Sequence, residues 1–156
     1  MSNHALGAAL TVLVLAAGTV AAQPAKPDDA QIAHIAYTAG DIDIKAAQQA
    51  LQKSRNREVR EFAQDMVRDH TAVNKQALAL VQKLQVTPRD NPTSQALLKQ
   101  ATDERSKLSQ LQGAAFDCAY AQNEVAYHQT INNALQTTLI PSAFNPELKS
   151  LLENPT

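Results

Sequence analysis

Residues 56–85 read NREVREFAQDMVRDHTAVNKQALALVQKLQ. Apolar side chains recur in this segment at three- and four-residue spacing, which predicts an amphipathic helix with one buried stripe. The stripe consists of Val59, Phe62, Ala63, Met66, Val73, Ala77, Leu80, Val81 and Leu84. At about 100° per residue, His70 projects roughly 20° from Val59 and therefore lies inside the stripe. A buried imidazole without a partner costs several kcal/mol, so His70 needs a partner, a metal ion or a catalytic role.

The rest of the chain predicts further helices and no strand. Periodicity predicts helices over about residues 30–53, 94–111, 114–139 and 146–153, with Pro141 ending the fourth of the long helices. On the first of them, Asp43 projects about 20° from Ile32 and also lies within an apolar stripe. The expected fold is all-α: a four-helix bundle with an extra short helix and a shortened C-terminal helix.

The N-terminal segment resembles a targeting signal. Residues 5–20 are small or apolar, and Val20-Ala21-Ala22 fits a small-residue cleavage site. We expect a signal peptide over residues 1–22, a flexible lead-in over 23–29 and a helical domain over 30–156. The mature chain would then lie in the periplasm or cell envelope without a transmembrane domain. A membrane anchor is the alternative, although the apolar stretch is short for a span of about 20 residues.

Composition excludes some classes of function. The net charge is -1, 4% of the residues are aromatic and there is no Trp. Nucleic-acid binding requires a basic face and stacking side chains, so no nucleic-acid partner is expected. Cys118 is the only cysteine, which rules out an intramolecular disulfide.

Ionisable residues on the predicted helix faces form two groups. A turn near Arg55 would make the first two helices antiparallel and place Asp43 and His70 about 4 Å apart along the axis, close enough to touch. On the fourth helix, Asp117, Glu124 and His128 share one flank, and Glu124 and His128 are one turn apart. By contrast, His34 projects about 160° from its stripe and is expected at the surface.

Carboxylates and imidazoles from facing helices are typical ligands of iron, manganese or zinc in bundle cores. The candidate metal ligands are Asp43, His70, Asp117, Glu124 and His128. The usual di-iron signature, Glu-x-x-His, is absent: Val67 precedes His70 by three residues and Val125 precedes His128 by three. The alternative is a satisfied polar network, with His70 bonded to Asp43 and His128 bonded to Glu124 or Tyr120.

Two stretches carry a family resemblance: REFAQDMVRDHTAVNKQALAL, residues 60–80, and GAAFDCAYAQNEVAYHQTINNAL, residues 113–135. They are similar to the DUF4142 family of secreted bacterial domains, often labelled predicted outer membrane proteins. The resemblance implies a ferritin-like bundle at the cell envelope, with no established activity. It covers Asp43, Asp69, His70, Phe116, Asp117, Tyr120 and His128. Relatives usually continue through a longer last helix with another histidine, which this sequence lacks.

These observations favour a secreted binding or envelope-stress protein over an efficient enzyme, with no certain cofactor and iron, manganese or zinc as candidates. One alternative is a structural module that uses the groove beside the short last helix to form a homodimer or to bind an envelope protein. Another is a di-metal oxidase or peroxide-handling enzyme.

Overall fold

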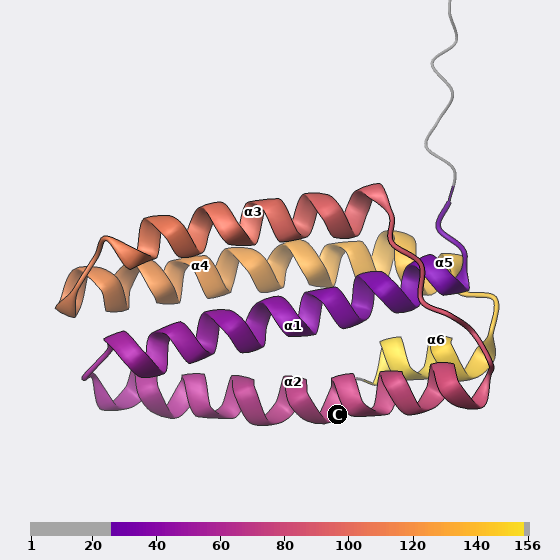
Figure 1. Cartoon of the computed structure of the whole chain (residues 1–156), viewed down its shortest axis with the longest axis horizontal. Coiled ribbons are helices and arrows are strands. Elements are labelled where there is room, and N and C mark those ends of the chain that lie inside the picture. The colour runs from indigo at the N-terminus through magenta and orange to yellow at the C-terminus, as the bar shows by residue number, and fades with distance from the viewer. Residues whose placement is uncertain (1–25, 155–156) are drawn as a thin grey trace, which may run out of the picture.

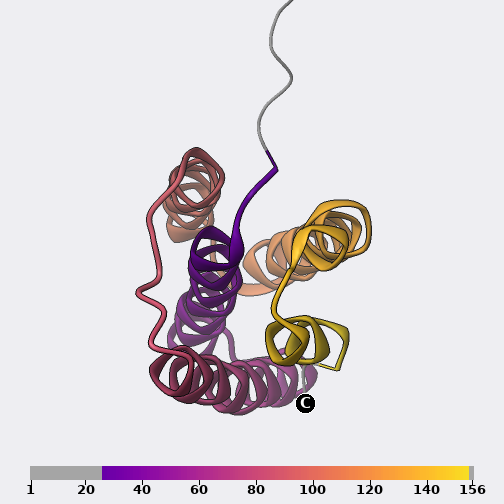
Figure 2. The ribbon, with the colours of Figure 1, turned by 90° about the vertical axis from the view of Figure 1, so that its right-hand side faces the viewer.

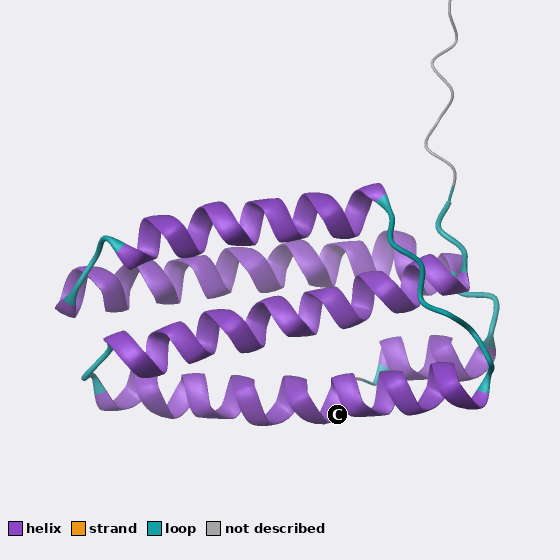
Figure 3. Ribbon diagram, viewed as in Figure 1, coloured by secondary structure: helices purple, strands orange, loops and turns teal. Residues whose placement is uncertain are grey.

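The computed structural model describes residues 26–154, and within them every regular element is helical (Figure 3). The predicted all-α class is therefore confirmed. The elements are α1 (Asp29–Lys53), α2 (Arg57–Lys83), α3 (Pro92–Ser109), α4 (Gly113–Ala134), the π-helical segment η1 (Leu135–Leu139), α5 (Ile140–Ser142) and α6 (Pro146–Glu153). The predicted signal peptide and the start of the lead-in lie outside the described residues. Among residues 26–154, no helix combines the length and apolar character needed to cross a membrane.

Helix α1 is the central element of the bundle. It runs antiparallel to α2, and α3 and α4 form a second antiparallel hairpin (Figure 1). Seen along the bundle, α2, α3 and α4 surround α1 (Figure 2). Helix α6 lies beside the C-terminal end of α2. The connection over residues 84–91 joins α2 to α3 on the other side of α1. As a result, α1 can present side chains to three neighbours at once.

Short polar side chains fix the starts of the helices. The side chain of Asn56 accepts the backbone N–H groups of Glu58 and Val59, and so caps α2. Helix α3 begins two residues before the predicted start, because Asn91 caps it and Pro92 fits the first helical position. Helix α1 likewise begins at Asp29, inside the expected lead-in, because Asp28 and Gln31 form a capping box.

The fourth helix ends one residue after Pro141, three residues beyond the predicted end at about residue 139. The helix continues through η1 and α5 to Ser142. Within η1, the backbone N–H of Ile140 donates to the carbonyl of Leu135, five residues earlier. A proline ring clashes with the carbonyl four residues before it, and the wider π turn accommodates Pro141 without breaking the helix.

The core consists of two apolar clusters with a polar layer between them. One cluster lies at the end of the bundle where α1 begins, and its members are Ile32, Ala33, Ile35, Val81, Leu139, Leu148 and Leu152. The other lies at the opposite end, with Ala46, Ala47, Ala50, Ala63, Leu108, Phe116 and Tyr120. The polar layer contains the buried Asp43, Asn74 and Glu124. The candidate site is therefore part of the interior.

Candidate metal centre

Asp43 is the centre of the polar layer. It lies on α1 between the two apolar clusters and is only 3% exposed. Burial disfavours the ionised carboxylate and raises the pKa of Asp43, whereas the charges of His70 and His128 and a hydrogen bond with Glu124 oppose the rise. A buried carboxyl group of this kind requires partners from the neighbouring helices.

His70 approaches Asp43 from α2. The antiparallel α1–α2 hairpin brings the two residues to the same level, and Nε2 of His70 lies 3.1 Å from Oδ2 of Asp43. The imidazole is partly exposed, with 25% of its side chain accessible, whereas the carboxylate is closed to solvent on nearly all sides. His70 therefore lies between the buried layer and the surface.

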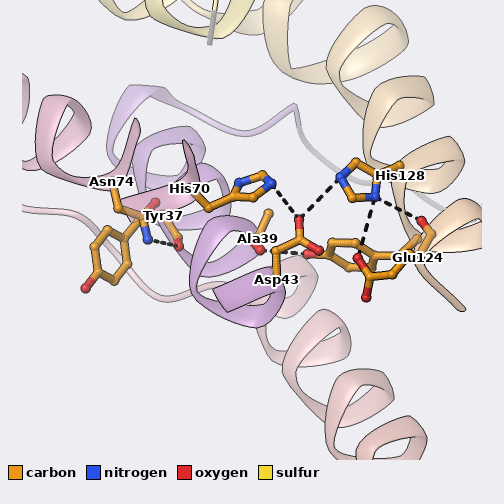
Figure 4. A network of polar contacts seen from close by, with 8 residues as sticks. Tyr37, Ala39, Asp43, His70, Asn74, Glu124 and His128 are labelled. Carbon is orange, nitrogen blue, oxygen red and sulfur yellow. Dashed lines mark hydrogen bonds and ion pairs between the residues drawn. The ribbon is translucent and has the colours of Figure 1, made fainter. Parts of the chain in front are cut away.

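His128 approaches the same oxygen from α4 (Figure 4). Its Nε2 lies 3.7 Å from Oδ2 of Asp43, and its Nδ1 lies 2.9 Å from the backbone carbonyl oxygen of Glu124. A carbonyl only accepts, so Nδ1 carries the proton and, in the neutral ring, the lone pair of Nε2 faces Asp43. Histidine ligands of metals are commonly held in this way, with one ring nitrogen bonded to a carbonyl and the other directed at the ion.

Three potential ligand atoms converge at this point. One atom each from Asp43, His70 and His128 lies within 4.8 Å of the others, and the two imidazole rings have their centroids 6.0 Å apart. Around a bound zinc ion, ligands about 2.0–2.2 Å from the metal lie ~3–4 Å from one another. The observed spacing needs only small side-chain movements to reach that geometry.

Glu124 lies beside these three potential ligands on α4. It is 3% exposed, and its Oε2 is 4.0 Å from Nδ1 of His128. Burial raises its pKa to about 8, and the charge of Asp43 and a hydrogen bond with it add to the rise. Among residues 26–154, the hydroxyl of Tyr120 has no hydrogen-bond partner, and the carboxyl group of Glu124 has only Asn123 and Asp43 as partners. Only a proton held between the two carboxyl groups links Glu124 to Asp43.

The structure does not bring Asp117 to this group. It precedes Glu124 by seven residues, two turns or ~10 Å along α4, and the atoms that converge come from Asp43, His70 and His128. His34, expected at the surface, is half-buried, and its Nδ1 lies 3.0 Å from the hydroxyl of Ser94 on α3. Packing of α3 against α1 covers a face that the helical pattern alone marks as exposed.

Tyr127 is a residue of the site that the sequence did not single out. Its hydroxyl donates to the backbone carbonyl of Ala39 at 2.9 Å and so ties α4 to α1 one turn from Asp43. Burial raises the pKa of Tyr127, and the charges of Asp43 and Glu124 add to the rise. Its position three residues after Glu124 and next to His128 in the sequence was the available signal.

Fold and site together define a helical bundle with a buried carboxylate–imidazole cluster at the meeting point of α1, α2 and α4. The chain belongs to the family described as Domain of unknown function (DUF4142), whose family model matches residues 15–155. Comparisons with curated proteins and with solved structures give no significant match.

Proposed function

We propose that this protein binds one transition metal ion, zinc, iron or manganese, through Asp43, His70 and His128. The observation that carries the proposal is the convergence of three ligand atoms within 4.8 Å in a layer that is closed to solvent around Asp43. Nitrogen and carboxylate ligands suit all three metals. Glu124 is not among the converging ligand atoms, and its hydrogen bond with Asp43 places it to accept a proton from a metal-bound water.

The unpaired acceptors favour a metal over a self-contained polar network. In a satisfied network, the carboxyl groups of Asp43 and Glu124 would each have several donors among the described residues, whereas they have little beyond the proton that they share. Each unpaired buried acceptor costs about 1–3 kcal/mol, and more when it is charged. A divalent cation offsets this cost for both carboxylates at once.

A single-metal site is also favoured over a di-metal oxidase. Among residues 26–154, this is the one set of three or more histidine, cysteine or acidic side chains with converging ligand atoms. Asp117 lies too far along α4 to bridge a second ion, and no Glu-x-x-His motif supplies further ligands. The role supported best is therefore metal binding, with the ion joining three helices.

Secretion to the periplasm or cell envelope is part of the proposal. It rests on the apolar residues 5–20 and the Val20-Ala21-Ala22 cleavage site. The ferritin-like comparison is a proposal as well, supported by two antiparallel hairpins joined by one connection across α1. A mature N-terminus at Gln23 in the periplasmic fraction of an expressing cell would support secretion, and the unprocessed chain in the cytoplasm would contradict it.

The test of metal binding uses residues 23–156 purified without an affinity tag. We expect about one equivalent of metal by elemental analysis. We also expect a rise of several degrees in the melting temperature of chelator-treated protein when the preferred ion is added in excess. His70→Gln and His128→Gln should each remove most of this rise, because each deletes one ligand.

His34→Gln is the matched control, since it removes an imidazole from the same bundle away from the cluster. It should leave the metal-dependent rise intact. If none of the three ions changes the melting temperature of the unmodified chain, the proposal fails. It also fails if His34→Gln reduces the rise as much as the other two variants.

A further inference from the structure

The proposed metal ion would have a coordination position that the protein does not fill. A zinc site with four protein ligands is closed, whereas a site with three protein ligands holds water or another exogenous ligand in the fourth position. Here the converging ligand atoms belong to Asp43, His70 and His128. Two histidines and one carboxylate likewise leave open positions on iron. The open position exists only with the ion in place, so any ligand there depends on the proposed function.

The open position faces the side of the cluster that solvent reaches. The side chain of Asp43 is 4% exposed and closes the inner side, whereas those of His70 and His128 are 25% and 36% exposed. The two imidazoles approach the same carboxylate oxygen from either side (Figure 4). An ion held by these three side chains would therefore take its further ligand from the side of the imidazoles, away from Asp43.

An apolar groove begins at His128. The groove lies between α2 and α4 and has a volume of about 520 Å³, and His128 is one of the residues that line it. Its apolar walls are formed by Val59, Phe62 and Met66 from α2 and by Ala121 and Val125 from α4. From His128 back to Tyr120, the wall of α4 extends over eight positions, or ~12 Å. A ligand that leaves the ion past His128 therefore enters an apolar groove.

The walls of the groove favour an uncharged, apolar chain. Phe62 is 39% exposed and Val125 is 59% exposed, so contact with a chain would remove apolar surface from water. Glu124 also lines the groove, but its carboxylate oxygens are closed to solvent. Glu58 is the other carboxylate and lies twelve positions before His70, or ~18 Å along α2. The half of the groove near the site therefore presents no free charge to the chain of a ligand.

We infer that the metal-loaded protein binds a monocarboxylate with an apolar chain, whose carboxylate takes the open position on the ion and whose chain lies along Phe62 and Val125. Carboxylate oxygen is a common ligand of all three candidate metals. A divalent ion balances the charges of Asp43 and Glu124, so a monoanion meets no net negative charge. A dicarboxylate would place a second charge against the apolar walls, and an alkylammonium group has no lone pair for the ion.

Isothermal titration calorimetry with octanoate tests the inference. The mature chain carries one equivalent of the ion that raises its melting temperature most, and chelator-treated protein is titrated in parallel. We expect one-to-one binding to the loaded protein and at least about tenfold weaker binding to the metal-free protein, because the bond to the ion is then absent. Acetate lacks the chain and octanol lacks the carboxylate, so each should bind the loaded protein at least about tenfold more weakly than octanoate.

Val125→Asn separates the contact of the chain from that of the carboxylate. Val125 is 59% exposed and tolerates a polar side chain, which should weaken octanoate binding about threefold or more and leave acetate binding unchanged. Leu98→Asn is the matched control, since Leu98 is 39% exposed on α3 and is not among the residues that line the groove. It should change neither affinity. Both variants should keep the metal-dependent rise in melting temperature.

Equal octanoate affinity with and without the ion, acetate binding as tight as octanoate binding, or an unchanged octanoate affinity in Val125→Asn would overturn the inference. The same holds if octanoate does not bind and sedimentation shows a stable dimer, because a second copy of the chain would then occupy the groove. Absence of octanoate binding in protein that keeps its metal-dependent melting shift overturns this inference alone, whereas loss of the melting shift overturns both proposals.

Discussion

Two carboxyl groups, those of Asp43 and Glu124, share a layer that is nearly closed to solvent. Burial and mutual repulsion make it costly to ionise both, and the pKa of each is raised. At neutral pH, metal-free protein therefore keeps a proton on Glu124. Binding of a divalent ion would release that proton, because the ion stabilises the ionised form.

The raised pKa of Glu124 predicts how the stability of metal-free protein depends on pH. The folded state holds a proton on Glu124 up to about pH 8, whereas the unfolded chain releases it near 4.5. The stabilisation is thus fully present below pH 4.5 and is lost as the pH rises through 8. The free energy of unfolding should fall across this window by up to about 1.4 kcal/mol per pH unit.

Urea denaturation at a series of pH values measures this slope. Glu124→Gln should flatten it, because the amide does not titrate. The control Glu61→Gln, at an exposed position on α2, should keep the slope of the unmodified protein. A stability that rises between pH 5 and 8 in the unmodified protein would contradict the prediction.

At the scale of the elements, Gly40 allows α1 and α2 to approach closely. A Cβ atom added at Gly40 would clash with Oδ1 of Asn74 on α2. Asn74 is 6% exposed, and its amide nitrogen donates to the backbone carbonyl of Tyr37 at 3.4 Å. A glycine in the middle of a helix costs about 1 kcal/mol relative to alanine, and the close packing of Asn74 is the reason for it.

Gly40→Ala should lower the free energy of unfolding by about 1–3 kcal/mol, because Asn74 must move out of a packed position. In an Asn74→Ala background, the same change should raise stability by up to about 1 kcal/mol, because only the helix propensity of alanine is left. A double-mutant cycle by chemical denaturation measures this coupling. Identical effects of Gly40→Ala in both backgrounds would show that Asn74 does not set the constraint.

Helix α6 is held to the start of α1 by one side chain. The carboxylate of Asp29 accepts the backbone N–H groups of Phe144 and Asn145, at 2.8 and 2.9 Å. Asn145 in turn caps α6 by accepting from Glu147 and Leu148. Because an eight-residue helix is not stable alone, its order depends on this anchor and on the burial of Leu148 and Leu152.

Asp29→Ala should loosen α6 without unfolding the bundle. We expect faster amide hydrogen exchange over residues 144–153 and unchanged protection in the middle of α1 and α2. Asp41→Ala is the control, since its carboxylate is bonded to Lys45 on its own helix. Equal exchange rates over residues 144–153 in the two variants would show that the Asp29 anchor is dispensable.

At the scale of the whole molecule, the polar layer separates two apolar cores. On α1, the clusters are represented by Ile32 and Ala46, which are fourteen positions or ~21 Å apart. The side chains between them include Asp43, which connects to α2 and α4 through imidazoles rather than through apolar contacts. An ion at this level would join the three helices between the two apolar clusters.

Small deletions in the two clusters should have additive effects. Ile32→Val and Phe116→Leu should each cost about 0.5–1.5 kcal/mol, and the double variant should equal their sum within about 0.5 kcal/mol. Phe116 and Tyr120 stack within one cluster, with ring centroids 6.1 Å apart. Phe116→Leu combined with Tyr120→Leu is therefore expected to deviate from additivity. A coupling between Ile32 and Phe116 as large as that within the cluster would mean one continuous core.

The sequence by itself determined the long helices, some of their caps and the first half of the site. Hydrophobic periodicity, Asn56 before α2 and Asn145-Pro146 before α6 are local signals, because capping and helix formation depend on residues within one or two turns. The contact between Asp43 and His70 followed from the same local rules, since a short turn fixes the level of two antiparallel helices.

Only the tertiary structure decided which residues of α4 join that pair. The rise and rotation of a helix place Asp117, Glu124 and His128 on one flank, and the packing of α4 on α1 selects the level at which this flank meets Asp43. The π turn before Pro141, the cover over His34 and the open groove between α2 and α4 depend on the same packing. Such contacts join residues far apart in the chain, and the shapes of many side chains determine them together.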